Sequence, residues 1–180
     1  EIRRLRKLIW TQTKCIIEGR LSVLHPLYSS KLDLQLRPDL ASSICKPETG
    51  IKHAQRAWTH FQRNICVQDI DILEQAGRFH DQGLSVAVLN MAHPRTPGGG
   101  VGGGAGAQEE NFYRRSDAAR FFAMNLPQQE EHYPIPEDSC LVSRGVSVFR
   151  GPESSGYHFL CKPFRCTMFS CAAIHLPELS

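Results

Sequence analysis

The sequence has no apolar run long enough to cross a bilayer, which takes about 18 consecutive apolar residues. Its opening segment, EIRRLRKLIW, is too charged and too short for such a span, and no secretory leader is recognisable. A block of like charge is also missing, since 21 basic residues stand against 18 acidic ones and the net charge is +3. These absences predict an intracellular protein, cytoplasmic or nuclear, with no membrane contact and no direct nucleic-acid binding.

Closely paired cysteines are missing as well. The seven cysteines are spread along the chain, and an odd number without a leader predicts reduced thiols. Cys161, Cys166 and Cys171 lie five residues apart and His175 follows them, whereas zinc ligands usually come in pairs such as C-x-x-C. Their neighbours, FRCTMFSCAA, are typical of a buried strand in which cysteine acts as a small apolar residue. No metal and no cofactor are expected.

The chain has 180 residues, 41% of them hydrophobic and 22% charged, which suits a single domain with a real core. Hydrophobic periodicity and turn residues predict helices and strands in alternation, and therefore an α/β layered domain. The predicted helices cover residues 2–18, 51–63, 71–79 and 108–124. The predicted strands cover residues 65–67, 84–90, 146–150 and 164–173, the second of them as a buried central strand. Residues 25–50 and 127–136 are predicted to be loops.

A glycine-rich segment follows the strand at 84–90. Seven of the nine residues from Gly98 to Gly106 are glycine. Such a backbone adopts positive φ freely and approaches a ligand closely, and its successive amides can form a concave nest for phosphate oxygens. A flexible linker is the structural alternative, although the run has no serine and lies within one domain.

Two nucleotide-binding motifs compete for this segment. The dinucleotide pattern G-x-G-x-x-G is present from Gly98 to Gly103, but seven residues, MAHPRTP, separate it from the preceding strand. Glu109 and Glu110 would also place negative charge where a pyrophosphate sits in that fold. A P-loop is excluded because no Gly-Lys-Ser/Thr follows the glycines.

A third interpretation rests on the glycines and the acidic pair together. Gly98-Gly99-Gly100, seven further residues and Gln108-Glu109-Glu110 resemble the GGG…QEE signature of microbial-type poly(ADP-ribose) glycohydrolases of the macrodomain superfamily. Flanking segments are similar to the same family, and the resemblance runs from about Ile65 to Ala173. These segments are VQDIDIL, VAVLNMAHPRTPGGG, ENFYRRSD, YPIPEDSCLVSRGVSVFR and KPFRCTMFSCAA.

The resemblance implies a fold and a division of the chain. The expected fold is a three-layer α/β/α macrodomain-like mixed sheet. Residues 1–64 would form an N-terminal helical extension, and residues 65–180 the macrodomain-like catalytic core. We expect this core to be truncated at its C-terminal end, because the family continues with further elements, including a second loop that closes over the diphosphate.

The resemblance also implies an activity, namely hydrolysis of the ribose–ribose O-glycosidic bonds of poly(ADP-ribose) with release of ADP-ribose. Poly(ADP-ribose) or an ADP-ribosylated protein would be the partner. Glu110 would be the general acid and base, and Glu109 would bind ribose hydroxyls. The other substrate-binding residues would be Asp71 at the adenine, Asn90 at the ribose, and Gly98, Gly99, Gly100, Val101 and Gln108 in the loop and its end.

Each assignment has a structural alternative. Acidic residues are common in the first turn of a helix, where the helix dipole lowers their pKa, while burial would raise the pKa of a general acid. Asp71, or less favourably Asp69, also suits a helix cap, and Asn90 suits a turn at the end of a strand. His93 is a weak candidate for a base. A non-catalytic domain that binds ADP-ribose is the alternative to an enzyme.

Overall fold

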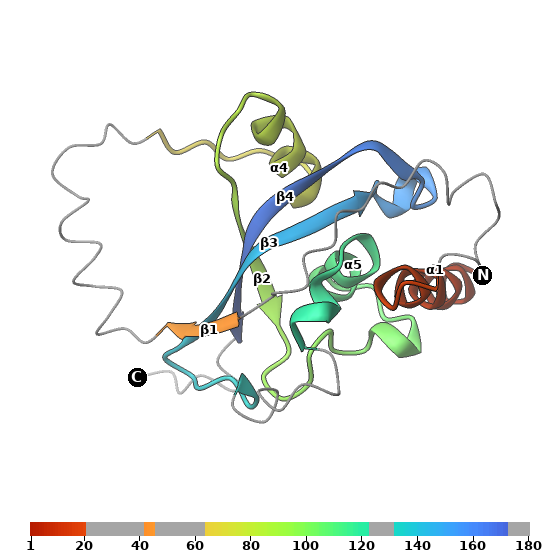
Figure 1. The fold of residues 1–180 in the computed structure, drawn as a ribbon, viewed down its shortest axis with the longest axis horizontal. Coiled ribbons are helices and arrows are strands. Elements are labelled where there is room, and N and C mark those ends of the chain that lie inside the picture. The colour runs from red at the N-terminus through yellow and green to blue at the C-terminus, as the bar shows by residue number, and fades with distance from the viewer. Residues whose placement is uncertain (21–41, 46–63, 123–131, 173–180) are drawn as a thin grey trace, which may run out of the picture.

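The structure is a computed structural model that describes residues 1–20, 42–45, 64–122 and 132–172. Helices and strands alternate along most of this length (Figure 1). The elements are α1 (Ile2–Ile17), β1 (Ser42–Cys45), α4 (Ile72–Asp81), β2 (Ala87–Ala92), α5 (Gln108–Arg115), β3 (Cys140–Arg150) and β4 (Phe159–Ala172), with the 3-10 helices η2 (Val101–Gly103), η3 (Ala118–Phe122) and η4 (Glu153–Ser155).

The described strands form one mixed sheet in the order β1-β3-β4-β2. β3 runs antiparallel to β1 and to β4, while β2 runs parallel to β4, with Ala87 opposite Thr167 and Ala92 opposite Ala172. A parallel neighbour needs a crossover, whereas η4 and a short turn are enough to join β3 to β4. The predicted α/β architecture is confirmed.

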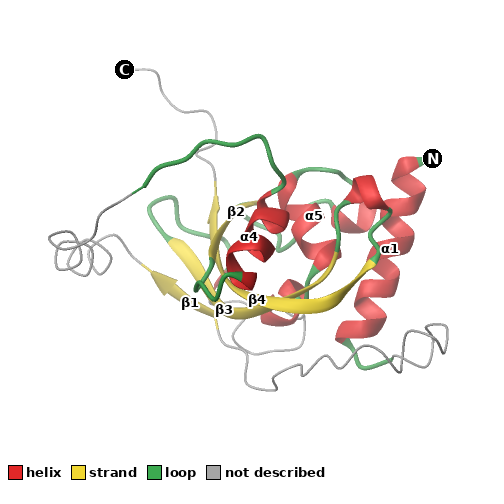
Figure 2. Ribbon diagram, turned by 90° about the horizontal axis from the view of Figure 1, so that it is seen from above, coloured by secondary structure: helices red, strands yellow, loops and turns green. Residues whose placement is uncertain are grey.

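One face of the sheet carries the core. Along β2, Val88, Asn90 and Ala92 are buried, while the residues between them are exposed. α4 and α5 pack on the buried face and contribute Leu73 and Phe112 to the same cluster as Val88 (Figure 2). The opposite face of β2 carries Leu89 and Met91, which are 49% and 64% exposed.

Two predicted helices are confirmed nearly at their predicted bounds. α1 buries Ile9, Thr13 and Ile16, whose spacing places them on one side of the helix. α4 begins directly after Asp71, whose carboxylate accepts hydrogen bonds from the amides of Leu73 and Glu74. Both helices are defined by local patterns, an apolar stripe in the first and a side-chain cap in the second.

Other elements differ from the prediction. Residues 65–67 form no strand, and Ile65 and Val67 are 92% and 93% exposed. β1 lies within the region predicted as a loop, and β3 and β4 begin six and five residues before their predicted starts. β2 begins at Ala87 and lies at one edge of the described sheet rather than at its centre. The helix predicted at 51–63 lies outside the described residues.

The helix predicted at 108–124 is interrupted. α5 ends at Arg115, and Ser116 adopts an extended conformation with φ −141° and ψ 174°. Ser116 pairs with Val148 of β3 in an isolated bridge, and the chain then continues as η3. Pairing with the sheet therefore replaces helical continuation at this position.

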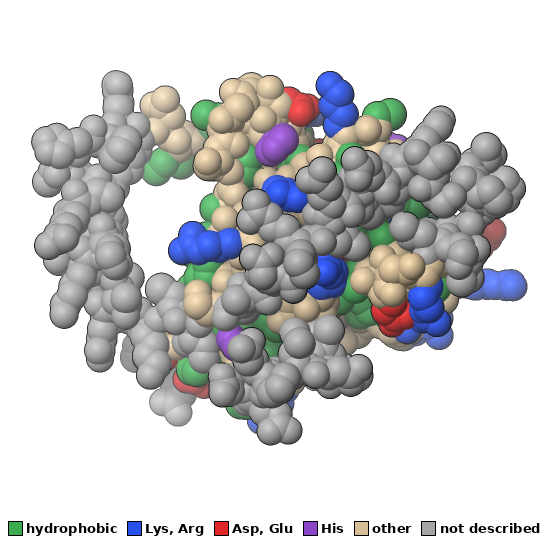
Figure 3. Space-filling view, in the orientation of Figure 1, with side chains coloured by type: hydrophobic (Ala, Val, Ile, Leu, Met, Phe, Trp, Pro, Cys, Tyr) green, Lys and Arg blue, Asp and Glu red, His purple; other side chains and the backbone are tan. Residues whose placement is uncertain are grey.

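Two surface features bear on membrane and nucleic-acid contact. No helix there combines the length and the apolar character needed to cross a bilayer. On the face drawn in Figure 3, the basic side chains among the described residues lie as separate spots and form no continuous patch.

A buried carboxylate should make stability depend on pH. Asp117 accepts a hydrogen bond from the amide of Ser147 at 2.7 Å, and burial raises its pKa from the ordinary 3.8 to about 6. The folded state therefore binds this proton more tightly than the unfolded state, and the free energy of unfolding falls as pH rises from about 4 to about 6. We expect Asp117→Asn to remove this loss and to be more stable than the wild type at pH 7, by up to about 3 kcal/mol.

Urea unfolding of both proteins at pH 4 and at pH 7 measures the difference. At pH 4 the difference between the two free energies of unfolding should be much smaller, because the wild-type carboxyl is then protonated in the folded state and about half protonated in the unfolded state. If the variant and the wild type differed in free energy of unfolding by the same amount at both pH values, burial would not raise the pKa of Asp117.

Candidate active site

The acidic pair lies in the first turn of α5. Glu109 and Glu110 are only 3% and 7% exposed, although charged residues at a helix start are usually solvated. Burial of two adjacent carboxylates requires hydrogen-bond donors that compensate for the lost water. Those donors are backbone amides of the glycine-rich loop and of His93, which precedes the loop.

Backbone amides of the loop bind both carboxylates. The amides of His93 and Gly98 donate to the two oxygens of Glu109 at 2.8 and 3.1 Å, and the amide of Gly100 donates to Oε1 of Glu110 at 2.9 Å. The sequence predicts that the loop amides bind phosphate, but the amides of Gly98 and Gly100 bind the glutamates instead. The loop therefore positions the acidic pair.

Only glycine fits at the first two loop positions. Gly98 has φ +74°, and a Cβ there would lie 2.6 Å from the ring of Tyr113. Gly99 has φ +50°, and a Cβ would lie 2.7 Å from Oε1 of Glu110 and 3.0 Å from Oε2 of Glu109. At both positions a side chain is disfavoured by the positive φ and by the close contacts that its Cβ would make.

Gln108 joins α5 to the edge of β2. Its Oε1 accepts a hydrogen bond from the amide of Met91 at 2.9 Å, and its Nε2 donates to the carbonyl of Leu89 at 2.8 Å. The side-chain amide thus pairs with the strand as a neighbouring peptide group would. Val101 is buried in η2, and its amide donates to the carbonyl of Gly98 at 3.0 Å.

Two buried oxygens of this region have no hydrogen-bond partner in the described part of the chain. They are Oε2 of Glu110 and Oδ1 of Asn90, and further along α5 Oδ1 of Asn111 and the hydroxyl oxygen of Tyr113 also lack one. Asn90 is fully buried on β2, and its Nδ2 donates to Oγ of Ser170 at 3.0 Å. An unsatisfied buried acceptor costs about 1–3 kcal/mol, so each oxygen is suited to accept a hydrogen bond from a ligand.

The electrostatics of the pair differ from those of a solvated helix start. Burial raises the pKa of Glu109, and the neighbouring charge of Glu110 acts in the same direction, while the amides of His93 and Gly98 and the side chain of Asn90 lower it. The net shift is upward. Buried carboxyl groups whose pKa is raised by burial are common at sites of acid–base chemistry.

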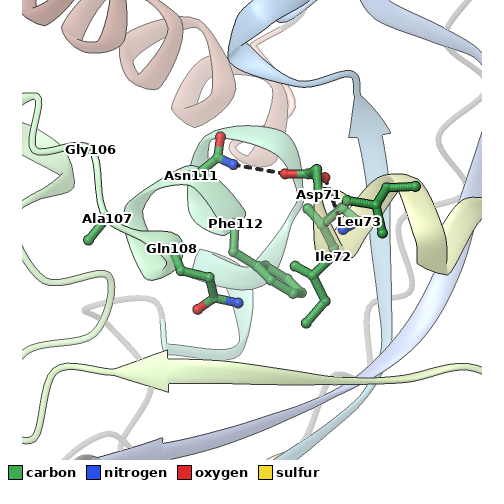
Figure 4. A pocket seen from close by; sticks show the side chains of 9 residues that line it. Asp71, Ile72, Leu73, Gly106, Ala107, Gln108, Asn111 and Phe112 are labelled. Carbon is green, nitrogen blue, oxygen red and sulfur yellow. Dashed lines mark hydrogen bonds between the residues drawn. The ribbon is translucent and has the colours of Figure 1, made fainter. Parts of the chain in front are cut away.

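A cavity of about 340 Å³ lies between the starts of α4 and α5 (Figure 4). The side chains of Ile72 and Phe112 lie side by side in it, and Gln108 is next to them. Asp71 and Asn111 line its polar part and are joined by a long hydrogen bond of 3.5 Å. Polar and apolar groups thus share the lining, which suits a flat, partly polar ligand.

Comparison with known proteins identifies the family. The profile described as microbial-type PARG, catalytic domain, where PARG is poly(ADP-ribose) glycohydrolase, matches residues 28–151. The chain belongs to this microbial-type PARG family. No curated protein matches the chain.

Solved PARG structures have the same fold. The PARG of Thermomonospora curvata bound to the inhibitor ADP-HPD is 25% identical, with a TM-score of 0.64, and the match covers 93% of this chain and 62% of that one. The PARG of Deinococcus radiodurans in complex with ADP-ribose is 27% identical, with a TM-score of 0.62, and the match covers 73% and 55% of the two chains. The chain therefore spans less than two thirds of the length of these PARG structures.

The predicted PARG site residues fall into two groups. The glycines, the glutamates, Gln108 and Asn90 lie around the first turn of α5 and the end of β2, whereas Asp71 lies at the start of α4. Sequence reasoning missed Asn111 and Arg115, which connect the two groups. Both have a signal in the sequence, since they follow the acidic pair on the same helix and are four residues apart.

Asp71 has a structural role in this chain. Besides capping α4, its two oxygens accept hydrogen bonds from Nη1 of Arg115, both at 2.8 Å, and Arg115 is only 2% exposed. Removing one partner of such a pair leaves a buried charge without compensation. The carboxylate therefore holds the start of α4 against α5, whatever ligand it also binds.

Replacing Asp71 should destabilise the fold. We expect Asp71→Ala to lower the free energy of unfolding by about 3 kcal/mol, through loss of the helix cap and of the partner of Arg115. Urea unfolding measures the change. Asp69→Ala is the matched control, because Asp69 is exposed two residues earlier. Equal stability of the two variants would contradict the structural role of Asp71.

Proposed function

We propose that the chain hydrolyses ribose–ribose O-glycosidic bonds in poly(ADP-ribose) and releases ADP-ribose. Membership of the PARG family supports this proposal, as do the related structures, which are described as glycohydrolases bound to an inhibitor or to ADP-ribose. The main structural support for the proposal is the environment of the Glu110 carboxylate. This carboxylate is buried, one oxygen is held by Gly100, and the other has no partner in the described structure.

In the proposed reaction, Glu110 works as a general acid and then as a general base. Its protonated Oε2 donates a proton to the leaving ribose oxygen while the glycosidic C–O bond breaks and an oxocarbenium-like centre develops. Water then attacks that centre, and the Glu110 carboxylate accepts the proton released by the water. The amide of Gly100 keeps Oε1 in place throughout, so that Oε2 is the oxygen that faces the substrate.

Glu109 and Asn90 would hold the ribose. Both oxygens of Glu109 accept a backbone amide, and each keeps a further lone pair for a ribose hydroxyl. The unpartnered Oδ1 of Asn90 provides another acceptor on the same side of the sheet. A ribose with adjacent hydroxyls matches this set of closely spaced acceptors.

The cavity between α4 and α5 is the proposed adenine site. Phe112 and Ile72 offer apolar contacts to a purine, and Asp71 is an acceptor for its amino group. The Gly98–Gly106 loop reaches this cavity at Gly106 and would cradle the diphosphate with amides that the glutamates do not use. We propose Asp71, Gly98, Gly99, Gly100, Val101 and Gln108 as the residues that line this path.

A paired assay separates catalysis from binding alone. Wild-type protein is incubated with labelled poly(ADP-ribose), and ADP-ribose is titrated into it in a calorimeter. Release of labelled ADP-ribose supports hydrolysis. Heat of binding without release of ADP-ribose would support the alternative, a non-catalytic ADP-ribose-binding domain. If neither heat nor release were observed, both functions would be excluded.

A further inference from the structure

The N-terminal helix lies directly on the glycine-rich loop. Nε of Arg3 donates to the carbonyl of Gly103 at 2.9 Å, and a Cβ at Gly104 would lie 2.7 Å from the carbonyl oxygen of Arg3. The guanidinium of Arg6 covers Gly106 so closely that a Cβ there would overlap it. The second half of the loop is therefore shaped to the surface of α1.

A chain of hydrogen bonds ties Arg6 to the loop by a second route. Nε and Nη2 of Arg6 donate to the two carboxylate oxygens of Glu153 at 2.6 and 2.8 Å. Glu153 also accepts the hydroxyl proton of Tyr157 at 2.7 Å, and that hydroxyl accepts from Nε of Arg114 at 3.0 Å. Nη1 of Arg114 then donates to the carbonyl of Ala105 at 2.8 Å.

The central ion pair of this network joins the positive charge of Arg6 to the negative charge of Glu153. The hydrogen bonds from Arg6 lower the pKa of Glu153 to about 2, so the carboxylate stays charged throughout the neutral range. Arg114 is fully buried, and the carbonyl of Arg114 accepts a further hydrogen bond from the hydroxyl of Thr13 in α1 at 2.8 Å. α1 thus contacts both the loop and α5, the helix that carries the glutamates.

Fixing the second half of the loop also fixes the first half. The amide of Ala105 donates to the carbonyl of Gly100 at 3.2 Å, and the amide of Gly100 binds Oε1 of Glu110. Glycines lose much conformational freedom on folding, so a loop of this composition keeps one shape only when other groups hold it. In this structure those groups come from α1 and α5, and Glu153 of η4 takes part in the link between them.

We propose that α1 positions the catalytic loop, with Arg6, Glu153, Tyr157 and Arg114 as positioning residues that keep the Gly100 amide on the Glu110 carboxylate. The proposal rests on the proposed function of Glu110. In this proposal α1, at the start of the predicted N-terminal extension, supports catalysis indirectly, and no residue of α1 has to contact the substrate.

Arg6→Ala in the full chain tests this role. Hydrogen exchange at the amides of residues 98–106 should become about tenfold faster, because the loop opens more often. The kcat for release of ADP-ribose should fall about tenfold to a hundredfold with little change in KM, since a misplaced acid affects the chemical step. Arg4→Ala is the matched control, because Arg4 is an exposed arginine of the same helix.

Two further variants separate positioning from simple destabilisation. Arg6→Lys keeps the charge but not the two-fold hydrogen bond to Glu153, so it should recover part of the lost kcat. Arg6→Ala combined with Glu153→Ala should be no slower than the slower single variant, because both remove the same link. Loop exchange and kcat in Arg6→Ala equal to those in Arg4→Ala would overturn the proposal. If the wild type releases no ADP-ribose, the proposed function fails, and loop exchange still decides the role of Arg6.

Discussion

Glu110→Gln is expected to reduce release of ADP-ribose from poly(ADP-ribose) by roughly 10³-fold, within the range found for loss of a general acid. Glutamine has nearly the same shape, and its amide oxygen can still accept the hydrogen bond from Gly100, so the loop keeps its conformation. The amide cannot deliver a proton to the leaving ribose oxygen. Calorimetry should therefore show ADP-ribose binding close to that of the wild type, while turnover is lost.

Glu74→Gln is the control for this variant. Glu74 is exposed in the first turn of α4, which makes it a helix-start glutamate without the burial of Glu110. Its replacement should leave hydrolysis unchanged within about twofold. Turnover by Glu110→Gln at a near-normal rate would show that another group donates the proton, and the mechanism proposed for Glu110 would be wrong.

The sequence predicted the features that depend on local patterns. The apolar stripe of α1, the cap at Asp71 and the strand before the glycines each follow from residues close together in the chain. The start of α5 at Gln108 was predicted for the same reason. The family resemblance, now supported by the family match, rested on the short signature from Gly98 to Glu110 and on flanking segments between about Ile65 and Ala173.

The contacts that shape the site were not predictable in this way. Arg6 and Glu153 are 147 residues apart, and Thr13 and Arg114 are 101 residues apart. Nothing in the local pattern indicates that Arg114, in a strongly polar helix, is fully buried. Its burial depends on Ala105 in the loop and on Tyr157 before β4, which only the tertiary fold brings together.

The false strand at 65–67 has a related cause. Ile65 and Val67 have the β-branched side chains that favour strands, but this preference expresses packing against neighbouring strands. No described strand pairs with these residues, and both are almost fully exposed. Conversely, Ser42–Cys45 became a strand because β3 offers a partner, although the surrounding residues suggested a loop.

Gly99→Ala should also impair hydrolysis strongly, by about a hundredfold, because it displaces both carboxylates at once. The added Cβ would lie 2.7 Å from Oε1 of Glu110 and 3.0 Å from Oε2 of Glu109, and φ +50° disfavours alanine in addition. These two oxygens accept hydrogen bonds from the amides of Gly100 and His93, so side chains that move to relieve the clash lose those hydrogen bonds. Activity should fall together with protection of the Gly98 and Gly100 amides against hydrogen exchange.

Gly102→Ala provides the comparison for Gly99→Ala within the same loop. A Cβ at Gly102 would meet no atom within 4 Å, and no positive φ is needed there. Alanine at this position should therefore keep the loop conformation and most of the activity, since the backbone amides stay in place. If Gly99→Ala and Gly102→Ala lost activity equally, general loss of loop flexibility would explain both, and contact between Gly99 and the two carboxylates would not be what positions them.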